Sequence, residues 1–277
     1  MLPKPWIFTA FFFSLVLIAG AGCSSLQSIS PTAGLERKLI FQPQPWPEEL
    51  ADRETPFEDV NFDSADGTRL HGWFLDHPDP AGVALFCHGN AGNIASRAES
   101  LMLLNQRHQL AAMMFDYRGY GKSEGRPSEQ GVFADARAAR KWLASRKQIA
   151  EQEIIVMGRS LGGAVAIELA SADGAKGLVL ASTFTSMPDV AKHVMPIVPS
   201  RLIMTQRFNS LAKIKNYHGP LLHSHGDADQ LIPIELGRKL FEAAPGRKRF
   251  VVIPNAGHND PQSAEYRTAF DEFLSSL

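Results

Sequence analysis

Cysteine is nearly absent from this chain, which has only Cys23 and Cys87 among its 277 residues. Two cysteines do not make the framework of cross-links seen in small disulfide-rich secreted domains. Cys87 ends an apolar segment, so we expect it to be a small buried side chain. The chain has nine histidines, but no pair has the spacing of a zinc site, and the motif His-Glu-x-x-His is missing. We therefore expect no metal and no other cofactor.

The chain also lacks an excess of charge of either sign. It has 28 Lys and Arg residues against 29 Asp and Glu residues, a formal net charge of -1, and 44% hydrophobic residues. A protein that binds nucleic acid needs a basic face that releases counterions from the phosphates. Here the basic residues are scattered apart from a short run at residues 247–249. The composition favours a single globular enzyme domain and argues against nucleic acid as a partner.

A long uncharged stretch occupies the N-terminus. Residues 6–22 follow Lys4 and the α-amino group, which is the composition of a secretory signal sequence. Residues 21–25 (AGCSS) resemble the lipidation site of bacterial lipoproteins, with Cys23 as the modified residue, although Gly20 stands where such sites usually have leucine. Two alternatives stay open, namely ordinary signal cleavage and an uncleaved membrane anchor, because the stretch is just long enough to span a bilayer. All three place the domain outside the cytoplasm, at a bacterial cell envelope.

The rest of the chain divides into a tether and a globular domain. Residues 23–49 lack hydrophobic periodicity and include Pro43, Pro45 and Pro47, which predicts an extended, poorly packed tether. The domain is expected over residues 50–277 and begins with a hairpin whose turn is Asp66-Gly67. Six near-continuous apolar segments then alternate with helical ones, at residues 83–87, 111–116, 154–157, 177–181, 221–225 and 249–253. This pattern predicts an α/β fold, with a mostly parallel sheet covered by helices on both faces.

One serine lies where a nucleophile is expected. Residues 158–162 (GRSLG) connect the apolar segment 154–157 to a predicted helix at 163–170. A serine on such a sharp strand-to-helix turn has an exposed hydroxyl, and the flanking glycines avoid a clash where strand and helix meet. Ser160 is therefore the candidate nucleophile. It needs a base to take its proton and an acid to orient that base.

Candidates for the base and the acid follow in the chain. His258 stands on a loop after the last apolar segment, and Asp227 and Asp229 stand on the loop after the preceding one. The order serine, aspartate, histidine, each just past a strand, is that of the α/β-hydrolases and excludes the trypsin-like and subtilisin-like orders. Asp116, at the end of an earlier segment, is a third candidate acid, although a carboxylate that organises a loop near Arg118 is the simpler interpretation.

The same chemistry needs hydrogen-bond donors for the negative charge that develops on the substrate oxygen. The backbone N–H of Leu161, directly after the serine, is one candidate. The second is the backbone N–H of Asn90, in the loop 88–93 (HGNAGN) that follows the apolar segment 83–87. That loop is also a glycine-rich turn into a helix with Asn93 as its cap, and the two interpretations are compatible.

Four motifs taken together resemble the α/β-hydrolase superfamily. They are HGNAGN at residues 88–93, DYRGYGKSEG at 116–125, GRSLGG at 158–163 and HGDAD at 225–229. The chain from about Phe57 onward is most similar to the lid-poor serine hydrolases, a branch with serine-aminopeptidase-like bacterial proteins and ABHD-type depalmitoylases. The resemblance implies hydrolysis of esters, thioesters or amides. The family pattern Gly-x-x-Asp-x-x-Ile/Val-Pro aligns Asp229 with the triad acid and leaves Asp227 to stabilise the turn.

Residues 183–220 stand where this superfamily inserts its lid, and the segment is short. It is rich in apolar residues, including several methionines, which adapt to irregular ligands. It could form the wall of an acyl-chain pocket, or it could consist of helices packed on the sheet.

We therefore expect a serine hydrolase that cleaves carboxylic esters or thioesters through an acyl-enzyme. Ser160, Asp229 and His258 would form its triad, and the substrate would be a small or lipid-like acyl compound. A serine peptidase or aminopeptidase-like amidase is the nearest alternative, although no feature identifies a pocket for an amine. A catalytically silent surface-binding lipoprotein is a further alternative.

Overall fold

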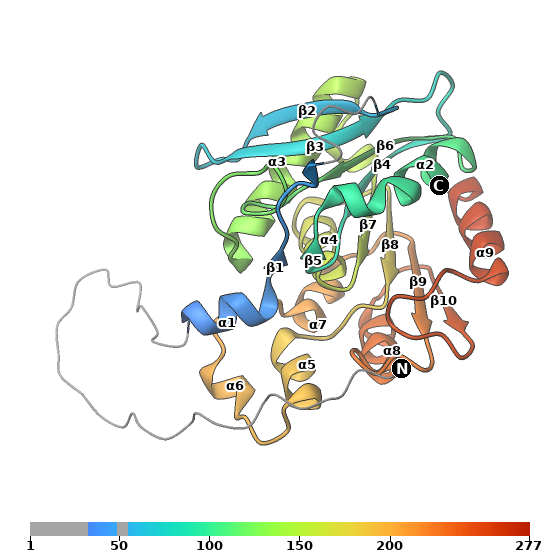
Figure 1. Ribbon diagram of the computed structural model, residues 1–277. Helices are drawn as coiled ribbons and strands as arrows, with labels where there is room; N and C mark the ends of the chain where they lie inside the picture. The colour runs from blue at the N-terminus through green and yellow to red at the C-terminus, as the bar shows by residue number, and fades with distance from the viewer. Residues whose placement is uncertain (1–32, 49–54) are drawn as a thin grey trace, which may run out of the picture. The chain divides into compact units, whose positions relative to one another are not determined.

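Eight strands form the central sheet of this protein, whose computed structural model describes residues 33–48 and 55–277 (Figure 1). The strand order is β10-β9-β8-β7-β4-β6-β3-β2. The antiparallel pairs are β2 with β3 and β3 with β6, and all other pairs are parallel. The strand bounds are Glu58–Asp63 for β2, Arg69–Leu75 for β3, Gly82–Cys87 for β4, Leu110–Phe115 for β6, Ile154–Arg159 for β7, Gly177–Ala181 for β8, Leu221–Gly226 for β9 and Lys248–Ile253 for β10.

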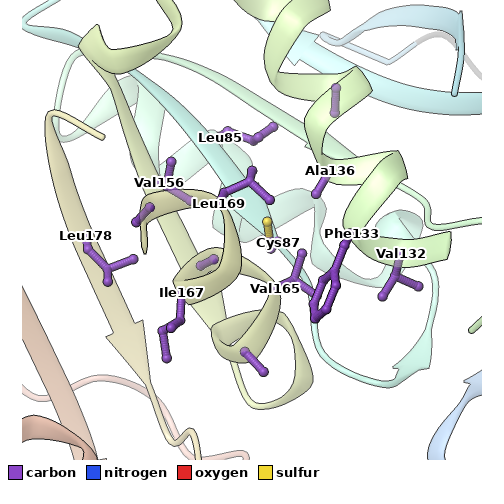
Figure 2. Close-up of a cluster of buried hydrophobic side chains, with 14 of the residues drawn as sticks. Leu85, Cys87, Val132, Phe133, Ala136, Val156, Val165, Ile167, Leu169 and Leu178 are labelled. Atoms are coloured by element: carbon purple, nitrogen blue, oxygen red, sulfur yellow. The ribbon is translucent and has the colours of Figure 1, made fainter. Parts of the chain in front are cut away.

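Helices cover both faces of this sheet, which confirms the predicted fold class. One face packs on α3 (Glu129–Lys147), α4 (Leu161–Asp173) and α8 (Ile234–Ala243), and the other on α2 (Ala98–Gln106) and α9 (Ala264–Ser275). Figure 2 shows the first face, where side chains of α3 and α4 lie over strand residues that include Leu85 and Cys87. Cys87 is fully buried, as expected. Neighbouring residues of the central strands β4, β6 and β7 alternate between the two cores, which is why these strands are largely apolar and buried along their length.

The predicted tether is wrong for the part of it that the structure describes. Residues 33–48 contain helix α1 (Ala33–Ile40) and strand β1 (Gln42–Pro43), and β1 pairs in parallel with β5 (Ala91–Gly92). Ile40 and Phe41 are buried. Prolines favour an extended backbone, and here that extended backbone lies on an edge strand that tolerates their missing N–H groups. Because α1 has only eight residues, it contains too few turns for a helical repeat of apolar residues to be recognised in the sequence.

The lid segment contains three short α-helices, namely α5 (Met187–Val194), α6 (Ser200–Ile203) and α7 (Ser210–Lys213), and a 3-10 helix at Ile214–Asn216. Met187, Val190 and Met204 pack against the core of the sheet. Other apolar side chains of the segment are exposed, at the end of α5, in the connection that follows and on α6.

The predicted signal sequence at residues 1–22 and Cys23 lie outside the described residues. Among those that are described, no helix is both long enough and apolar enough to cross a membrane. Residues 33–48 and 55–277 belong to one compact unit.

Candidate active site

Ser160 stands on a tight turn between β7 and α4. Its backbone has φ 55° and ψ -122°, a left-handed conformation that is rare for a residue with a side chain. A Cβ at Gly162 would come within 2.0 Å of the Cys87 carbonyl oxygen, and one at Gly158 within 2.2 Å of the Gly162 oxygen. The glycines that the sequence pattern singles out are therefore required by close backbone contacts.

Hydrogen bonds hold this strained residue from both sides. The N–H of Ser160 donates to the Ala181 carbonyl at 2.9 Å. The Ser160 carbonyl accepts the N–H of Gly163 at 2.9 Å and the hydroxyl of Thr183 at 2.8 Å. The turn is thus tied to β8 and to the first residues of the lid segment, which fixes the direction of the serine side chain.

His258 and Asp229 are hydrogen-bonded to each other. The distance from His258 Nδ1 to Asp229 Oδ2 is 2.7 Å. The other carboxylate oxygen, Oδ1, accepts the backbone N–H groups of Leu231 at 3.0 Å and Ile232 at 2.9 Å. Because an ionised carboxylate only accepts, Nδ1 of His258 carries the proton and Nε2 is left as a base.

The surroundings of Asp229 keep it ionised. Burial by itself would raise the pKa of this carboxyl, but hydrogen bonds from His225, His258 and the Ile232 N–H outweigh burial and hold the pKa below its ordinary value. His225 Nε2 lies 3.4 Å from Asp229 Oδ2 and 2.8 Å from the Ile232 carbonyl oxygen. A carboxylate that stays charged can stabilise a positive imidazole beside it.

The two rival aspartates have other partners. Asp227 Oδ1 accepts the backbone N–H of Asn255 at 2.6 Å, which joins the loops after β9 and β10. Asp116 Oδ1 accepts the backbone N–H of Ile94 at 2.9 Å. Burial raises the pKa of Asp116, and Arg118 forms its ion pairs with Asp66 and Asp135 rather than with Asp116. Among the three candidate acids, Asp229 is the one that bonds His258.

Arg159, next to Ser160, connects the turn between β7 and α4 to the loop after β10, which carries His258. Its guanidinium donates to the carbonyl oxygen of His258 and, at 3.5 Å, to that of Asp260. Sequence reasoning did not single out this residue, although its place inside the GRSLG motif was the available signal. A planar guanidinium suits this role because it can donate to two acceptors at once.

The two predicted oxyanion donors are unengaged. In the described part of the chain, neither the N–H of Asn90 nor that of Leu161 has a hydrogen-bond acceptor. His88 Nδ1 lies 2.7 Å from the Gly89 carbonyl oxygen, so it donates to the same peptide unit that carries the Asn90 N–H. Burial lowers the pKa of His88 to about 3, which keeps the ring neutral. The buried ring thus holds the peptide that presents the N–H.

Several known proteins are similar to this chain in sequence. A family model described as serine aminopeptidase, S33, matches residues 78–213. An uncharacterized protein of Mycobacterium tuberculosis is 39% identical over 239 residues, which is 85% of each chain. The alpha/beta hydrolase domain-containing protein WAV2 of Arabidopsis thaliana is 32% identical over 270 residues, which is 88% of each chain. The chain belongs to the α/β-hydrolase superfamily.

Solved structures share the fold of this α/β-hydrolase at low sequence identity. An esterase of Pyrococcus furiosus has a TM-score of 0.70 at 21% identity, with 86% of this chain and 97% of that chain covered. Acetyl xylan esterase 1 from Thermoanaerobacterium has a TM-score of 0.62 at 17% identity, with 88% of this chain and 98% of that chain covered.

The N-terminal segment of this hydrolase supports loop 88–93, which carries the candidate oxyanion donor Asn90 and is called the oxyanion loop below, a contribution that sequence reasoning missed. The Asn90 carbonyl accepts the N–H of Gln42 at 3.0 Å and the hydroxyl of Tyr120 at 2.7 Å, and the Asn90 side chain donates to the Ile40 carbonyl at 3.2 Å. Asn93, the predicted cap, accepts the N–H of Ala95 at 3.1 Å. Its amide also donates to the carbonyl oxygens of residues 44 and 45, at 3.2 and 2.8 Å. The bonds from this loop to residues 40, 42, 44 and 45 join positions about 50 apart, so no local sequence pattern predicts them.

Proposed function

We propose that this hydrolase cleaves carboxylic esters or thioesters through an acyl-enzyme on Ser160. The observation that carries the proposal is the hydrogen bond between His258 Nδ1 and an ionised Asp229, which leaves His258 Nε2 free to accept a proton. The strained serine turn and the two unengaged N–H groups of Asn90 and Leu161 supply the other parts that acyl transfer needs.

Each step follows from these roles. His258 Nε2 takes the proton of the Ser160 hydroxyl as Oγ forms a bond to the substrate carbonyl carbon, whose oxygen becomes negative and is stabilised by the two N–H groups. When the C–O or C–S bond to the leaving group breaks, His258 returns the proton to the departing atom. Water then attacks the acyl-enzyme in the same way and releases the carboxylic acid and free Ser160.

An amidase or aminopeptidase is the second candidate, because the matching family model is described as serine aminopeptidase. The fold neighbours whose names describe an activity include esterases, which favours the ester reaction. Purified protein should first be labelled with a fluorophosphonate, which reacts with an activated serine. A panel of p-nitrophenyl esters, acyl-thioesters and aminoacyl amides then separates the candidates. Turnover confined to the aminoacyl amides would replace the esterase proposal with the peptidase one, and an unlabelled protein would favour a non-catalytic binding role.

We also propose that the N-terminus places the enzyme at a membrane of the bacterial cell envelope. The support is sequence alone, namely the uncharged stretch at residues 6–22 and Cys23 in a lipoprotein-like context. A lipid-like acyl substrate would suit such a location.

A further inference from the structure

The exposed apolar side chains of this protein are concentrated on one part of its surface. Nine large hydrophobic side chains are exposed among the described residues, and seven of them lie on α1 or between the end of α5 and α6. We call these seven the apolar rim: Leu35, Leu39, Val194, Met195, Ile197, Leu202 and Ile203. Ile197 is 97% exposed and Leu202 is 84% exposed. A cluster of this kind on a soluble domain marks an interaction site.

Hydrogen bonds hold the two parts of the rim together. The buried Glu36 carboxylate of α1 accepts the N–H of Thr205 at 3.0 Å, the Thr205 hydroxyl at 2.7 Å and the N–H of Gln206 at 2.6 Å, directly after α6. Leu35 and Leu39 are four residues apart and therefore share one face of α1. Figure 1 shows α1, α5 and α6 near one another at the lower left of the molecule.

Basic side chains accompany the rim. A hollow of about 310 Å³ is lined by Lys192, Arg201 and Lys239, together with His193, Leu236 and Asp189. Its one carboxylate, Asp189, is paired with Arg201 at 2.7 Å. Lys192 and Lys239 form no ion pair with any described residue. The hollow therefore carries the charge of two lysines beyond its one ion pair, in a chain whose net charge is -1.

The short stretch of chain between Cys23 and α1 keeps this face near the membrane with which the N-terminus is proposed to associate. Helix α1 begins at Ala33, ten positions after Cys23. Ten residues span at most about 35 Å even when fully extended. A lipid on Cys23, or a membrane entry by residues 6–22, would hold α1 within that distance of the bilayer.

We infer that the apolar rim and the adjoining basic hollow dock on the surface of an anionic lipid bilayer. The rim side chains enter the boundary between headgroups and acyl chains, and Lys192 and Lys239 approach the lipid phosphates. The inference goes beyond the proposed reaction, and it rests on the proposed membrane association.

Docking in this orientation would bring the active site close to acyl groups in the membrane. The lid segment starts at Thr183, which donates to the Ser160 carbonyl, and His193 at the end of α5 bonds the carbonyl oxygen of Gln230, next to Asp229, at 3.1 Å. The docked face therefore borders the site, and hydrolysis of an ester held in a vesicle should depend on it.

Photocrosslinking on the full chain tests the docked face directly. Benzoylphenylalanine is placed at Ile197 or at Leu202, and the chain is reconstituted with phosphatidylglycerol vesicles or with phosphatidylcholine vesicles. Leu103 on α2, which is 49% exposed and lies outside the rim, is the matched control. We expect lipid adducts at Ile197 and Leu202 but not at Leu103. Lys192→Gln and Lys239→Gln should each lower the adduct yield on phosphatidylglycerol about fivefold.

The outcomes separate this inference from the proposed function. Crosslinking does not require turnover, so an inactive enzyme leaves the result interpretable. If the chain floats with the vesicles but yields no more adduct at Ile197 than at Leu103, the inference that the rim docks on the bilayer is wrong, while the proposed membrane association stands. If the chain does not float, both the docking inference and the proposed membrane association are wrong. As a second measurement, Ile197→Ser combined with Leu202→Ser should slow hydrolysis of a vesicle-embedded ester several-fold and leave a water-soluble ester unaffected. Equal effects on both esters would contradict the inference.

Discussion

At the residue scale, the proposed reaction depends on a serine in a backbone conformation that costs about 1 to 3 kcal/mol. The strain at Ser160 is balanced by bonds to Ala181, Gly163 and Thr183, all of which involve its backbone rather than its hydroxyl. Replacing the side chain therefore leaves these bonds in place.

Ser160→Ala should abolish fluorophosphonate labelling and lower kcat by at least about a thousandfold, because the attacking oxygen is gone. The melting temperature should stay close to that of the wild type. Ester turnover near the wild-type rate in the folded variant would remove Ser160 from the mechanism.

The two aspartates of the β9 loop allow a matched comparison. Asp229→Asn places an amide against His258, which disfavours the tautomer with Nε2 unprotonated. We therefore expect kcat to fall by about three to four orders of magnitude, which is roughly what this change costs in other triads. In Asp227→Asn the amide oxygen can still accept the Asn255 N–H, so activity should change little. The measurement is kcat on one p-nitrophenyl ester for both variants. A larger loss for Asp227→Asn would mean that Asp227 is the acid.

At the element scale, two connections hold the loops of the site in register, and neither belongs to the triad. Arg159 links the β7–α4 turn to the loop after β10. The N-terminal segment that contains α1 and β1 is bonded to the oxyanion loop and to the lid segment. Each can be removed without touching a reacting group.

Arg159→Met should lower kcat about tenfold with a smaller change in KM, since a charge-assisted hydrogen bond contributes about 1.5 to 3 kcal/mol and its loss frees the loop that carries His258. Arg159→Lys should recover part of the activity because one donor remains. If Arg159→Met matched the wild type in kcat, the guanidinium would not position His258.

Glu36→Gln should lower the free energy of unfolding by about 1 to 3 kcal/mol, because an amide group replaces one of the oxygens that accept from Thr205 and Gln206. Chemical denaturation measures the loss. Glu99→Gln, at an exposed position on α2, is the control and should be neutral. Equal stability of the two variants would show that the hydrogen bonds from Thr205 and Gln206 to Glu36 add nothing to the stability of the fold.

At the scale of the whole molecule, the proposed membrane location rests on the sequence of residues outside the described part of the chain. We expect the natural protein to partition into membranes, and Cys23→Ser to release it or leave it unprocessed. Metabolic labelling with a palmitate analogue reports lipid on Cys23. Unlabelled wild-type protein in the membrane fraction would favour an uncleaved anchor, and unlabelled protein in the soluble fraction would favour simple secretion.

The sequence by itself determined those features that depend on neighbours in the chain. The glycines around Ser160 and the alternation of apolar segments with helices act within a few residues, so they predicted the serine turn and the sheet covered on both faces. The order of serine, aspartate and histidine could also be read along the chain.

Only the tertiary structure decided which groups from distant segments meet. The family pattern favoured Asp229 over Asp227 as the acid, and the structure shows the partner of each: Asp229 bonds His258, whereas Asp227 bonds the backbone of Asn255. The prolines near residue 45 predicted a loose tether, yet this extended backbone pairs with β5 and accepts a hydrogen bond from Asn93, both about 50 residues away in the chain. The apolar rim is likewise assembled from α1 and from residues 194–203. Such contacts depend on how elements pack in space, and no short stretch of sequence carries that information.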